Sequence, residues 1–290
     1  MTTSTSGDRP LAAVAVQTAC FTLISANDAI IKVLVAEVPS WQVMAMRSSL
    51  ALLFLTPLIV YRLNQGTGHL RTSRLPMHAM RAILSAVSIF TYLEALRVLD
   101  LPVATTILFI APFFVVALSA LMLREPVPIN RWIAVIIGFC GALVILQPGP
   151  TGVSTAMLLM VVSAATWGAT MVMMRDLSRT ESDLAVIVYF NIFLVAISAS
   201  FAVPTWQPVS TTALGMIAVV AGLQLISQQL MMIAFRLAPA SVVAPVQYVQ
   251  LLWSVAAGWL IFGVWPAGSV WLGAAIIVAS GLYLIWSERA

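Results

Sequence analysis

Long apolar runs follow one another along the whole chain, separated by short connectors rich in proline, glycine and charge. A helix needs roughly 20 mostly apolar residues to cross the hydrocarbon core of a bilayer. Breaking the sequence at these connectors predicts ten such helices, over residues 11–35, 41–61, 76–97, 102–122, 131–147, 152–175, 184–203, 212–236, 240–263 and 268–286. The pattern predicts an all-α integral membrane protein. The fifth and tenth spans are almost purely apolar, and we expect them at the periphery of the bundle.

The composition of the chain also indicates a protein that lies in a lipid bilayer. Of the 290 residues, 61% are hydrophobic and 8% are charged, and the mean hydropathy is +1.04. Soluble domains carry roughly 25% charged residues, so a chain with so few could not be kept in water. The net charge of +4 does not indicate a nucleic-acid partner, because the basic residues fall mainly in short connectors, where membrane topology requires them.

The distribution of lysine and arginine predicts an orientation. If the N-terminus is cytoplasmic, eleven of the fourteen fall on that side: Arg9, Arg62, Arg71, Arg74, Arg81, Arg124, Arg131, Arg175, Arg179, Arg236 and Arg289. The other side holds Lys32 and Arg97, and Arg47 lies inside the second span. This asymmetry predicts a multi-pass protein of a prokaryotic cytoplasmic membrane with both termini cytoplasmic. The first apolar run is of full length, so we expect a retained span rather than a cleaved signal peptide.

The two halves of the chain resemble each other. The segment RVLDLPVATTILFIAPFFVVALSALMLREPVPINRW, from Arg97, is similar to RLAPASVVAPVQYVQLLWSVAAGWLIFGVWPAGSVW, from Arg236. In each segment a tryptophan, Trp132 or Trp271, stands 35 positions after the arginine. Five helices in each half place the halves in the membrane with opposite orientations. The sequence therefore predicts two inverted repeats, 1–150 and 151–290, in one membrane domain, an architecture that many carriers use for alternating access.

These motifs resemble a known family. Ten helices in two halves, LREP after the fourth span, FGVWP after the ninth and Arg47 early in the second are similar to the drug/metabolite transporter superfamily, EamA type. The resemblance covers nearly the whole chain and implies a secondary transporter of small organic solutes. The glutamines and aromatic residues of spans eight and nine most resemble the branch of bacterial exporters of aromatic and other amino acids, so amino acids are the expected cargo. Val264 stands where the second half would match Glu125, which argues against a role for paired acids.

Spans eight and nine carry amides and a hydroxyl at helical spacing. The stripes are Gln224 and Gln228 on one helix, and Gln247, Gln250 and Ser254 on the other. An amide within a bilayer needs a partner, which either a neighbouring helix or a polar cavity supplies. The counterparts of Gln247 and Gln250 in the first half are Leu108 and Ala111, so the architecture does not itself require amides there. The set favours the wall of a solute cavity.

Further candidates for substrate binding lie on other spans. They are Asn27 and Asp28 on the first, Ser88 and Tyr92 on the third, Trp167 on the sixth and Tyr248 on the ninth. Each has a structural alternative. Asp28 and Lys32 stand at i, i+4 and could neutralise each other. Arg47 is expected to pair with Asp28 or Glu94, and Glu94 is either a proton-coupling group or the local partner of Arg97. Tyr248 and the nearby Trp253 could pack against lipid or neighbouring helices instead.

Pro112 interrupts the fourth span. It lacks a backbone N–H, so the carbonyl near Leu108 loses its partner within the helix. We interpret Pro112 as a hinge, with a static kink as the alternative. A cavity of glutamine, serine, asparagine, tyrosine and tryptophan suits a zwitterion with an apolar side chain. A phosphorylated cargo would require basic residues in the pore, for which the sequence offers Arg47.

Motif searches narrow the class of function. The chain has no G-x-x-x-x-G-K-[ST] loop for ATP, no H-E-x-x-H zinc motif and no G-x-S-x-G nucleophile motif. We therefore expect neither an enzyme, nor a cofactor, nor a metal ion. A carrier of other metabolites or drugs, a channel and a membrane scaffold without transport activity stay as alternatives. The oligomeric state is open, with a monomer as one alternative.

Overall fold

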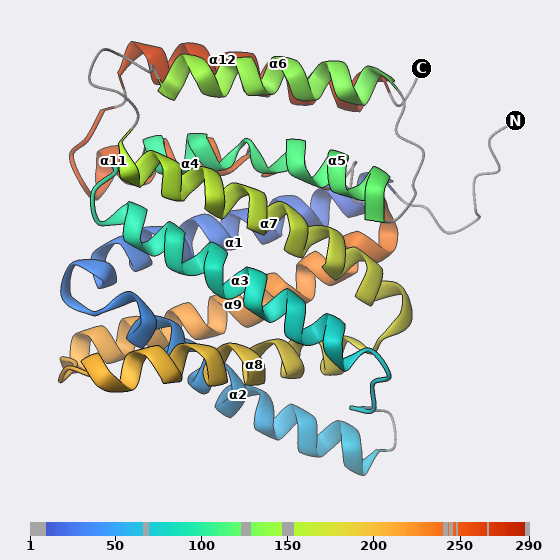
Figure 1. Cartoon of the computed structure of the whole chain (residues 1–290), viewed down its shortest axis with the longest axis vertical. Helices are drawn as coiled ribbons and strands as arrows, with labels where there is room; N and C mark the ends of the chain where they lie inside the picture. Colours follow the sequence, from blue (N-terminus) through green and yellow to red (C-terminus); the bar gives the residue numbers. More distant parts are fainter. Residues whose placement is uncertain are drawn as a thin grey trace, which may run out of the picture.

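A computed structural model describes residues 10–65, 70–122, 129–146, 154–239, 243, 246–247, 249–265 and 267–287. The regular structure in these ranges is helical. Its longer elements are α1 (Pro10–Glu37), α2 (Ser40–Asn64), α3 (Leu75–Leu96), α4 (Leu101–Leu108), α5 (Ala111–Met122), α6 (Ile129–Leu146), α7 (Thr155–Thr180), α8 (Asp183–Ala202), α9 (Thr211–Leu237), α11 (Val249–Leu260) and α12 (Gly268–Ser287). A short 3₁₀ helix, η1 (Val203–Thr205), follows α8. Figure 1 shows these helices running side by side.

Seven helical stretches in the described part of the chain are long and apolar enough to cross a membrane. They are Leu11–Glu37, Ser40–Asn64, Leu75–Leu96, Leu101–Met122, Thr155–Thr180, Asp183–Thr205 and Thr211–Leu237. Val249–Leu260 and Gly268–Ser280 are apolar but shorter. The protein is thus an all-helical, multi-pass membrane protein, and the predicted count of ten spans is not confirmed by this measure. Glu125 and both chain termini lie outside the described residues.

Serine caps define where three helices of the second half begin. The hydroxyls of Ser154, Ser182 and Ser210 accept hydrogen bonds from the backbone N–H three residues ahead, at 3.3, 3.1 and 3.1 Å. Each cap satisfies one of the N–H groups that the first turn of a helix leaves without a partner. After α11, Gly263 adopts a positive φ of 67°, which a side chain would oppose. The FGVWP motif therefore turns the chain after the helix.

The predicted fourth span is interrupted. α4 ends at Leu108 and α5 begins at Ala111, with a turn at Phe109 and Ile110. Pro112 lies in the first turn of α5, where its missing N–H and fixed φ are tolerated. The second half is irregular close to the corresponding position, because Val246 and Gln247, the counterparts of Ile107 and Leu108, form a 3₁₀ turn shortly before α11 begins at Val249.

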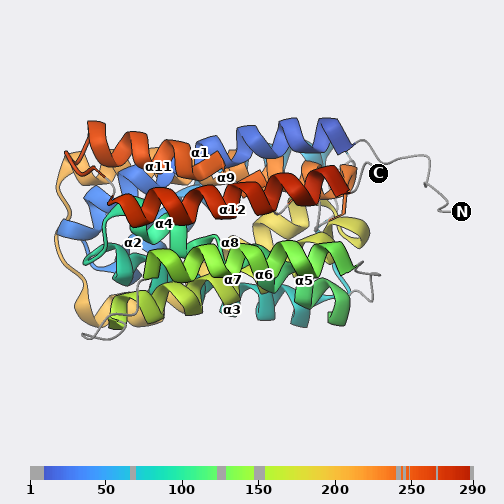
Figure 2. The same cartoon turned by 90° about the horizontal axis from the view of Figure 1, so that it is seen from above.

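Helix pairs repeat across the bundle. α1 packs against α9 much as α3 packs against α7, and α2 packs against α8. α6 and α12 pack mainly on each other and form a layer at one edge of the molecule (Figures 1 and 2). The expected peripheral position of the fifth and tenth spans is confirmed. α1, α3, α7 and α9 are left to enclose the middle of the bundle.

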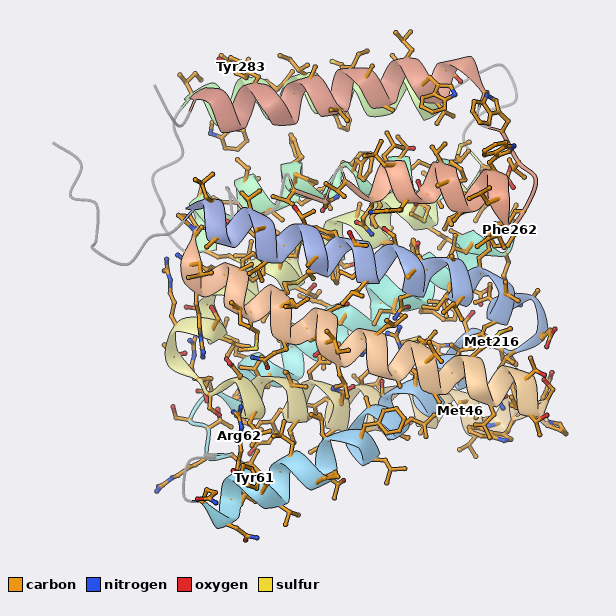
Figure 3. All side chains as sticks on the ribbon, turned by 180° about the vertical axis from the view of Figure 1, so that it is seen from behind. Met46, Tyr61, Arg62, Met216, Phe262 and Tyr283 are labelled. Carbon is orange, nitrogen blue, oxygen red and sulfur yellow. The ribbon has the colours of Figure 1, made fainter. Side chains whose placement is uncertain are left out.

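The side chains divide between a packed interior and an apolar outside. Two buried apolar clusters fill the bundle, and large apolar side chains such as Leu53, Leu121 and Leu272 are exposed, as expected for a surface that faces lipid. Figure 3 shows Met46 and Met216 near one end of the bundle, and Tyr61 and Arg62 at the opposite end of α2. Polar side chains in the middle therefore need a specific reason to be there.

Candidate functional site

A cavity of about 1030 Å³ lies between the central helices. This volume includes space that is open to solvent. α1, α3, α7 and α9 provide most of the wall, and α2, α4, α8 and α11 each add one residue. The polar lining residues are Asn27, Asp28, Arg47, Arg81, Ser85, Ser88, Tyr92, Ser163, Thr170, Gln224, Ser227, Gln228 and Gln250. Both halves of the chain thus contribute to one site.

Asp28 is the centre of a charged cluster in the cavity. Arg47 interacts with its carboxylate electrostatically, and Tyr92 lies against it. The amide Nε2 of Gln250 donates to Oδ2 of Asp28 over 3.5 Å. The opposite charges of Asp28 and Arg47 offset part of the desolvation free energy that either would cost alone. The cluster joins α1, α2, α3 and α11 around one carboxylate.

The α9 wall of the cavity carries polar atoms that have no hydrogen-bond partner in the described part of the chain. They are both amide atoms of Gln224, the hydroxyl of Ser227 and the Oε1 of Gln228. Nearly all buried polar atoms in native proteins are hydrogen-bonded. A group of unpartnered atoms facing one cavity is therefore best explained by water or a solute that binds there. Asn27, by contrast, donates to the Val220 carbonyl over 3.1 Å and ties α1 to α9.

Two serines join α3 to α7 at the cavity wall. The hydroxyls of Ser88 and Ser163 are 3.3 Å apart, and Ser163 can donate to the Ser88 carbonyl at 3.0 Å. Trp167 follows Ser163 by one helical turn and adds an aromatic ring to the same wall. This side of the site is consequently held by paired hydroxyls and offers a flat apolar surface.

A second buried cation, Arg81 on α3, lines the cavity away from Asp28. Its guanidinium lies over the Phe190 ring, with the Cζ atom 4.5 Å from the ring centroid. Nη1 donates to the Val186 carbonyl at 3.4 Å and Nη2 contacts the Met174 sulfur at 3.1 Å, while Nε has no partner within the described ranges. Arg81 is therefore held in place by neutral groups.

Eight of the eleven residues predicted to bind substrate line this cavity. They are Asn27, Asp28, Ser88, Tyr92, Trp167, Gln224, Gln228 and Gln250. Tyr248 lies outside the described residues. Ser254 is buried and donates to the Leu251 carbonyl of its own helix at 3.0 Å. Trp253 lies on the outside, 46% exposed, and donates to Thr22.

Gln247 was expected to line the cavity on the same wall as Gln250. This expectation was wrong, because Gln250 is among the residues that line the described cavity and Gln247 is not. Its Nε2 instead donates to the Leu108 carbonyl at 3.2 Å. The reason is local: the 3₁₀ turn at Val246 and Gln247 precedes α11, so the two glutamines do not belong to one regular helix. Gln247 supplies the partner that the interrupted helix of the first half lacks.

The charges also differ from the sequence interpretation. Lys32 donates to the carbonyls of Leu96 and Leu99, at 3.1 and 2.8 Å, rather than pairing with Asp28. The local alternative for Glu94 is confirmed, because its carboxylate lies 3.3 Å from Arg97 Nε. Arg47 and Asp28 line the same cavity and interact electrostatically, but they form no ion pair, so the expected pairing is not confirmed. Besides the neutral polar side chains that were predicted, the cavity contains a carboxylate and two guanidinium groups.

Sequence reasoning missed Arg81 as a cavity residue and placed it with the arginines of the cytoplasmic side. The signal was present in its spacing. Arg81, Ser85, Ser88 and Tyr92 follow one another at helical intervals of four, three and four residues, so they share one face of α3. Phe190 had no comparable signal, because α8 is apolar over most of its length.

The model of one protein family matches this chain twice. The EamA-like transporter family matches over residues 12–147 and again over 154–287. The chain belongs to this family. The resemblance inferred from LREP, FGVWP and the two halves is thereby confirmed.

Relatives of this EamA-like protein are named as transporters. It is 34% identical over 229 residues to a riboflavin transporter of Rhizobium johnstonii, covering 77% of this chain and 74% of the relative. It is 28% identical over 265 residues to an S-adenosylmethionine uptake transporter of Rickettsia conorii, covering 91% and 89%. A crystal structure with 19% sequence identity superposes with a TM-score of 0.71, covering 96% of this chain and 97% of that one. The superposition shows a shared fold. Together, the family and its relatives identify the chain as a transporter of small solutes.

Proposed function

We propose that this EamA-like protein is a secondary carrier whose cargo is a small organic molecule with a planar ring and hydrogen-bonding edges. The observation that carries the proposal is the group of unpartnered amide and hydroxyl atoms on α9 beside aromatic side chains of other helices. Trp167, Tyr92 and Phe190 provide flat apolar surfaces, and Gln224 and Gln228 provide donors and acceptors. Such a lining favours stacking of a ring with directional bonds at its edges.

Two features support transport by alternating access. The family model matches each half separately, and the helix pairs repeat between the halves. Carriers built from inverted repeats bind cargo at the interface of the repeats and expose it to each side in turn. We therefore propose that residues 1–150 and 151–290 are inverted five-helix repeats around the described cavity, in the cytoplasmic membrane with both termini cytoplasmic. The breaks in both halves suit a hinge, in which Pro112 takes part.

Riboflavin is the first candidate cargo. It has a planar ring system with polar edges, which fits the aromatic and amide lining, and a relative that is 34% identical is named for its transport. The similarity to an uptake transporter supports import as a direction to test.

Aromatic amino acids, with export as the direction, are the second candidate. The observation that favours them is the pair of opposite charges in the cavity. Asp28 could meet an ammonium group, and a guanidinium could meet a carboxylate. A zwitterion with an aromatic side chain would use the same ring-binding surface as riboflavin.

Flux in proteoliposomes tests the proposal. Purified protein is reconstituted, and uptake of labelled riboflavin and labelled tryptophan is measured with and without a proton gradient. A carrier gives saturable uptake and accelerated counterflow when the same unlabelled solute is loaded inside. Unsaturable flux without counterflow would indicate a channel instead. Absence of flux for both solutes and a panel of other small metabolites would contradict a transport function.

A further inference from the structure

Arg81 differs from three ion-paired arginines that lie near the ends of the helices, although Arg175 near the end of α7 is buried as well. Arg81 is only 4% exposed, whereas the ion-paired Arg74, Arg97 and Arg236 are partly exposed. Among the described residues those three pair with Asp176, Glu94 and Asp183, and no carboxylate is within ion-pair distance of Arg81. A charge of this kind needs an explanation that topology does not provide.

The contacts of Arg81 fix the guanidinium and leave bonding capacity unused. The Phe190 ring supports its face, and a carbonyl oxygen and a thioether sulfur take Nη1 and Nη2. A thioether is a weak acceptor, and the 3.4 Å bond to Val186 is long. The buried Nε has no hydrogen-bond partner among the residues that the structure describes. A planar guanidinium with free donors matches the geometry of a carboxylate or phosphate group.

Arg47 provides the internal comparison. It too is buried in the cavity, and its Nε lacks a partner among the described residues, but the carboxylate of Asp28 lines the same cavity and interacts with it electrostatically without forming an ion pair. Burying a charge is unfavourable unless an opposite charge and hydrogen bonds compensate it. Charged residues inside membrane proteins are rare and mark the pathways of ions or substrates. The compensation that Asp28 gives Arg47 is missing at Arg81 within the described part of the chain.

We propose that Arg81 is a binding subsite for an anionic oxygen group, a carboxylate or a phosphate, of the transported molecule. The subsite rests on the proposed function, in that the cavity receives a solute, and of the two candidate cargoes it fits the aromatic amino acids, because riboflavin itself carries no carboxylate or phosphate. Arg81 and Tyr92 are eleven positions apart on α3. At 1.5 Å per residue this is roughly 16 Å along the helix, long enough for an extended molecule with a ring at one place and an anionic group at the other.

Two matched pairs of probes test the subsite without any transport measurement. Riboflavin 5′-phosphate and riboflavin differ by a phosphate, and L-tryptophan and L-tryptophan amide differ by the charge of a carboxylate. Isothermal titration of the purified full-length protein in detergent gives the affinity of each. We expect the anionic member of at least one pair to bind about tenfold more tightly than its matched partner. The pair that shows the preference distinguishes phosphate from carboxylate.

Variants assign the preference to Arg81. Arg81→Met should abolish it, Arg81→Lys should retain part of it because the charge remains, and Arg97→Met, outside the cavity, should leave it unchanged. If neither pair shows a preference in the natural protein, or if the preference persists in Arg81→Met, the subsite is contradicted. No binding by either anionic probe contradicts it equally. If the preference is found but no solute moves in proteoliposomes, the carrier proposal fails and the anion subsite stands.

Thermal stability separates a binding role from a structural one. Replacing an uncompensated buried charge with an apolar side chain of similar volume is often neutral or stabilising. We therefore expect Arg81→Met to unfold at the same or a higher temperature than the natural protein. A clear fall in the unfolding temperature, with unaltered probe affinities, would make Arg81 a structural residue and overturn the proposal.

Discussion

Two irregular places in the chain, the turn between α4 and α5 in the first half and the 3₁₀ turn at Val246 and Gln247 before α11 in the second, lie close to corresponding positions, but their polar groups find partners in different ways. The first segment, α4–α5, carries Leu108 and Ala111, and the second, from the 3₁₀ turn into α11, carries Gln247 and Gln250. One glutamine crosses to the first segment and donates to the Leu108 carbonyl, and the other turns to Asp28 in the cavity.

This difference shows that one half of the chain can supply a hydrogen-bond donor that the other half lacks. Leu108 and Gln247 are 139 positions apart, the same offset that relates Arg97 to Arg236, so the bond joins counterparts. The bond satisfies a carbonyl freed by Pro112, which explains an amide that otherwise has no reason to lie there. Only Gln250 then remains available for the solute. The experiments below separate these two functions.

Gln250→Leu should give the largest effect, on transport. The change removes a cavity amide that donates to the Asp28 carboxylate over a long 3.5 Å bond, which should contribute at the lower end of the range of about 1.5–3 kcal/mol for hydrogen bonds to charged groups. We expect the apparent affinity for a transported solute to fall about tenfold or more in proteoliposomes. Gln229→Leu is the matched control, since Gln229 on α9 donates to Asp183 at 3.0 Å and is not among the cavity residues. Equal losses in both variants would remove the distinction.

Gly168→Ala should mainly reduce stability. A Cβ at Gly168 on α7 would lie 2.8 Å from the Phe114 Cβ and 3.1 Å from the Ala111 carbonyl oxygen, so α7 and the start of α5 must separate. Overpacking of this kind costs about 1–3 kcal/mol. We expect a lower midpoint of thermal unfolding in detergent, whereas Gly222→Ala, with nothing within 4 Å of the added carbon, should not lower it.

The second segment offers a comparison with Gly168. A Cβ at Gly258 on α11 would meet the Pro102 ring at 2.8 Å, without a backbone atom closer than 3.5 Å. We expect Gly258→Ala to lower the unfolding temperature less than Gly168→Ala does, because a ring edge shifts more readily than backbone. The reverse order would mean that the second segment is the more tightly packed of the two.

Gln247→Leu should have a smaller effect, and on stability rather than on transport. Hydrogen bonds between membrane helices contribute about 0.6 kcal/mol on average and about 1.7 at most. Losing the bond to Leu108 should lower the unfolding temperature slightly. The affinity for transported solutes should stay within about twofold of that of the natural protein. This is well below the tenfold change that about 1.4 kcal/mol represents. Gln247→Met, of similar length and without a donor, should behave alike. A large loss of affinity in both variants would show that Gln247 binds the solute.

The helices were predictable because apolar length is a local property. The predicted spans 76–97 and 212–236 match α3 and α9 to within a residue at each end, since proline, arginine and the serine cap define those ends in the sequence. The position of Pro112 in the sequence also indicated where the fourth span is interrupted, because proline has no backbone N–H to donate. The structure has this interruption in the two residues after Leu108.

The site was predictable only where regular helical geometry held. The face of α9 that carries Gln224 and Gln228 lines the cavity, because that helix is continuous. Gln247 and Gln250 were predicted to share one face of a helix. They do not, because Gln247 lies in a 3₁₀ turn that the sequence does not specify. Arg81 was assigned to the membrane surface because positive charge there has a general topological cause, and only the packing of Phe190 and Met174 shows that it is buried.

Ser254→Ala should give the smallest effect of the series. Ser254 lies one helical turn beyond Gln250, yet its hydroxyl bonds within its own helix, to the Leu251 carbonyl at 3.0 Å. Such a bond to a preceding carbonyl satisfies the hydroxyl locally and adds little to helix stability. We expect transport kinetics unchanged and stability within about 0.5 kcal/mol. A measurable loss of affinity would show that α11 rotates during transport to present Ser254 to the solute, and the division of labour between Gln247 and Gln250 would then hold for one conformation alone.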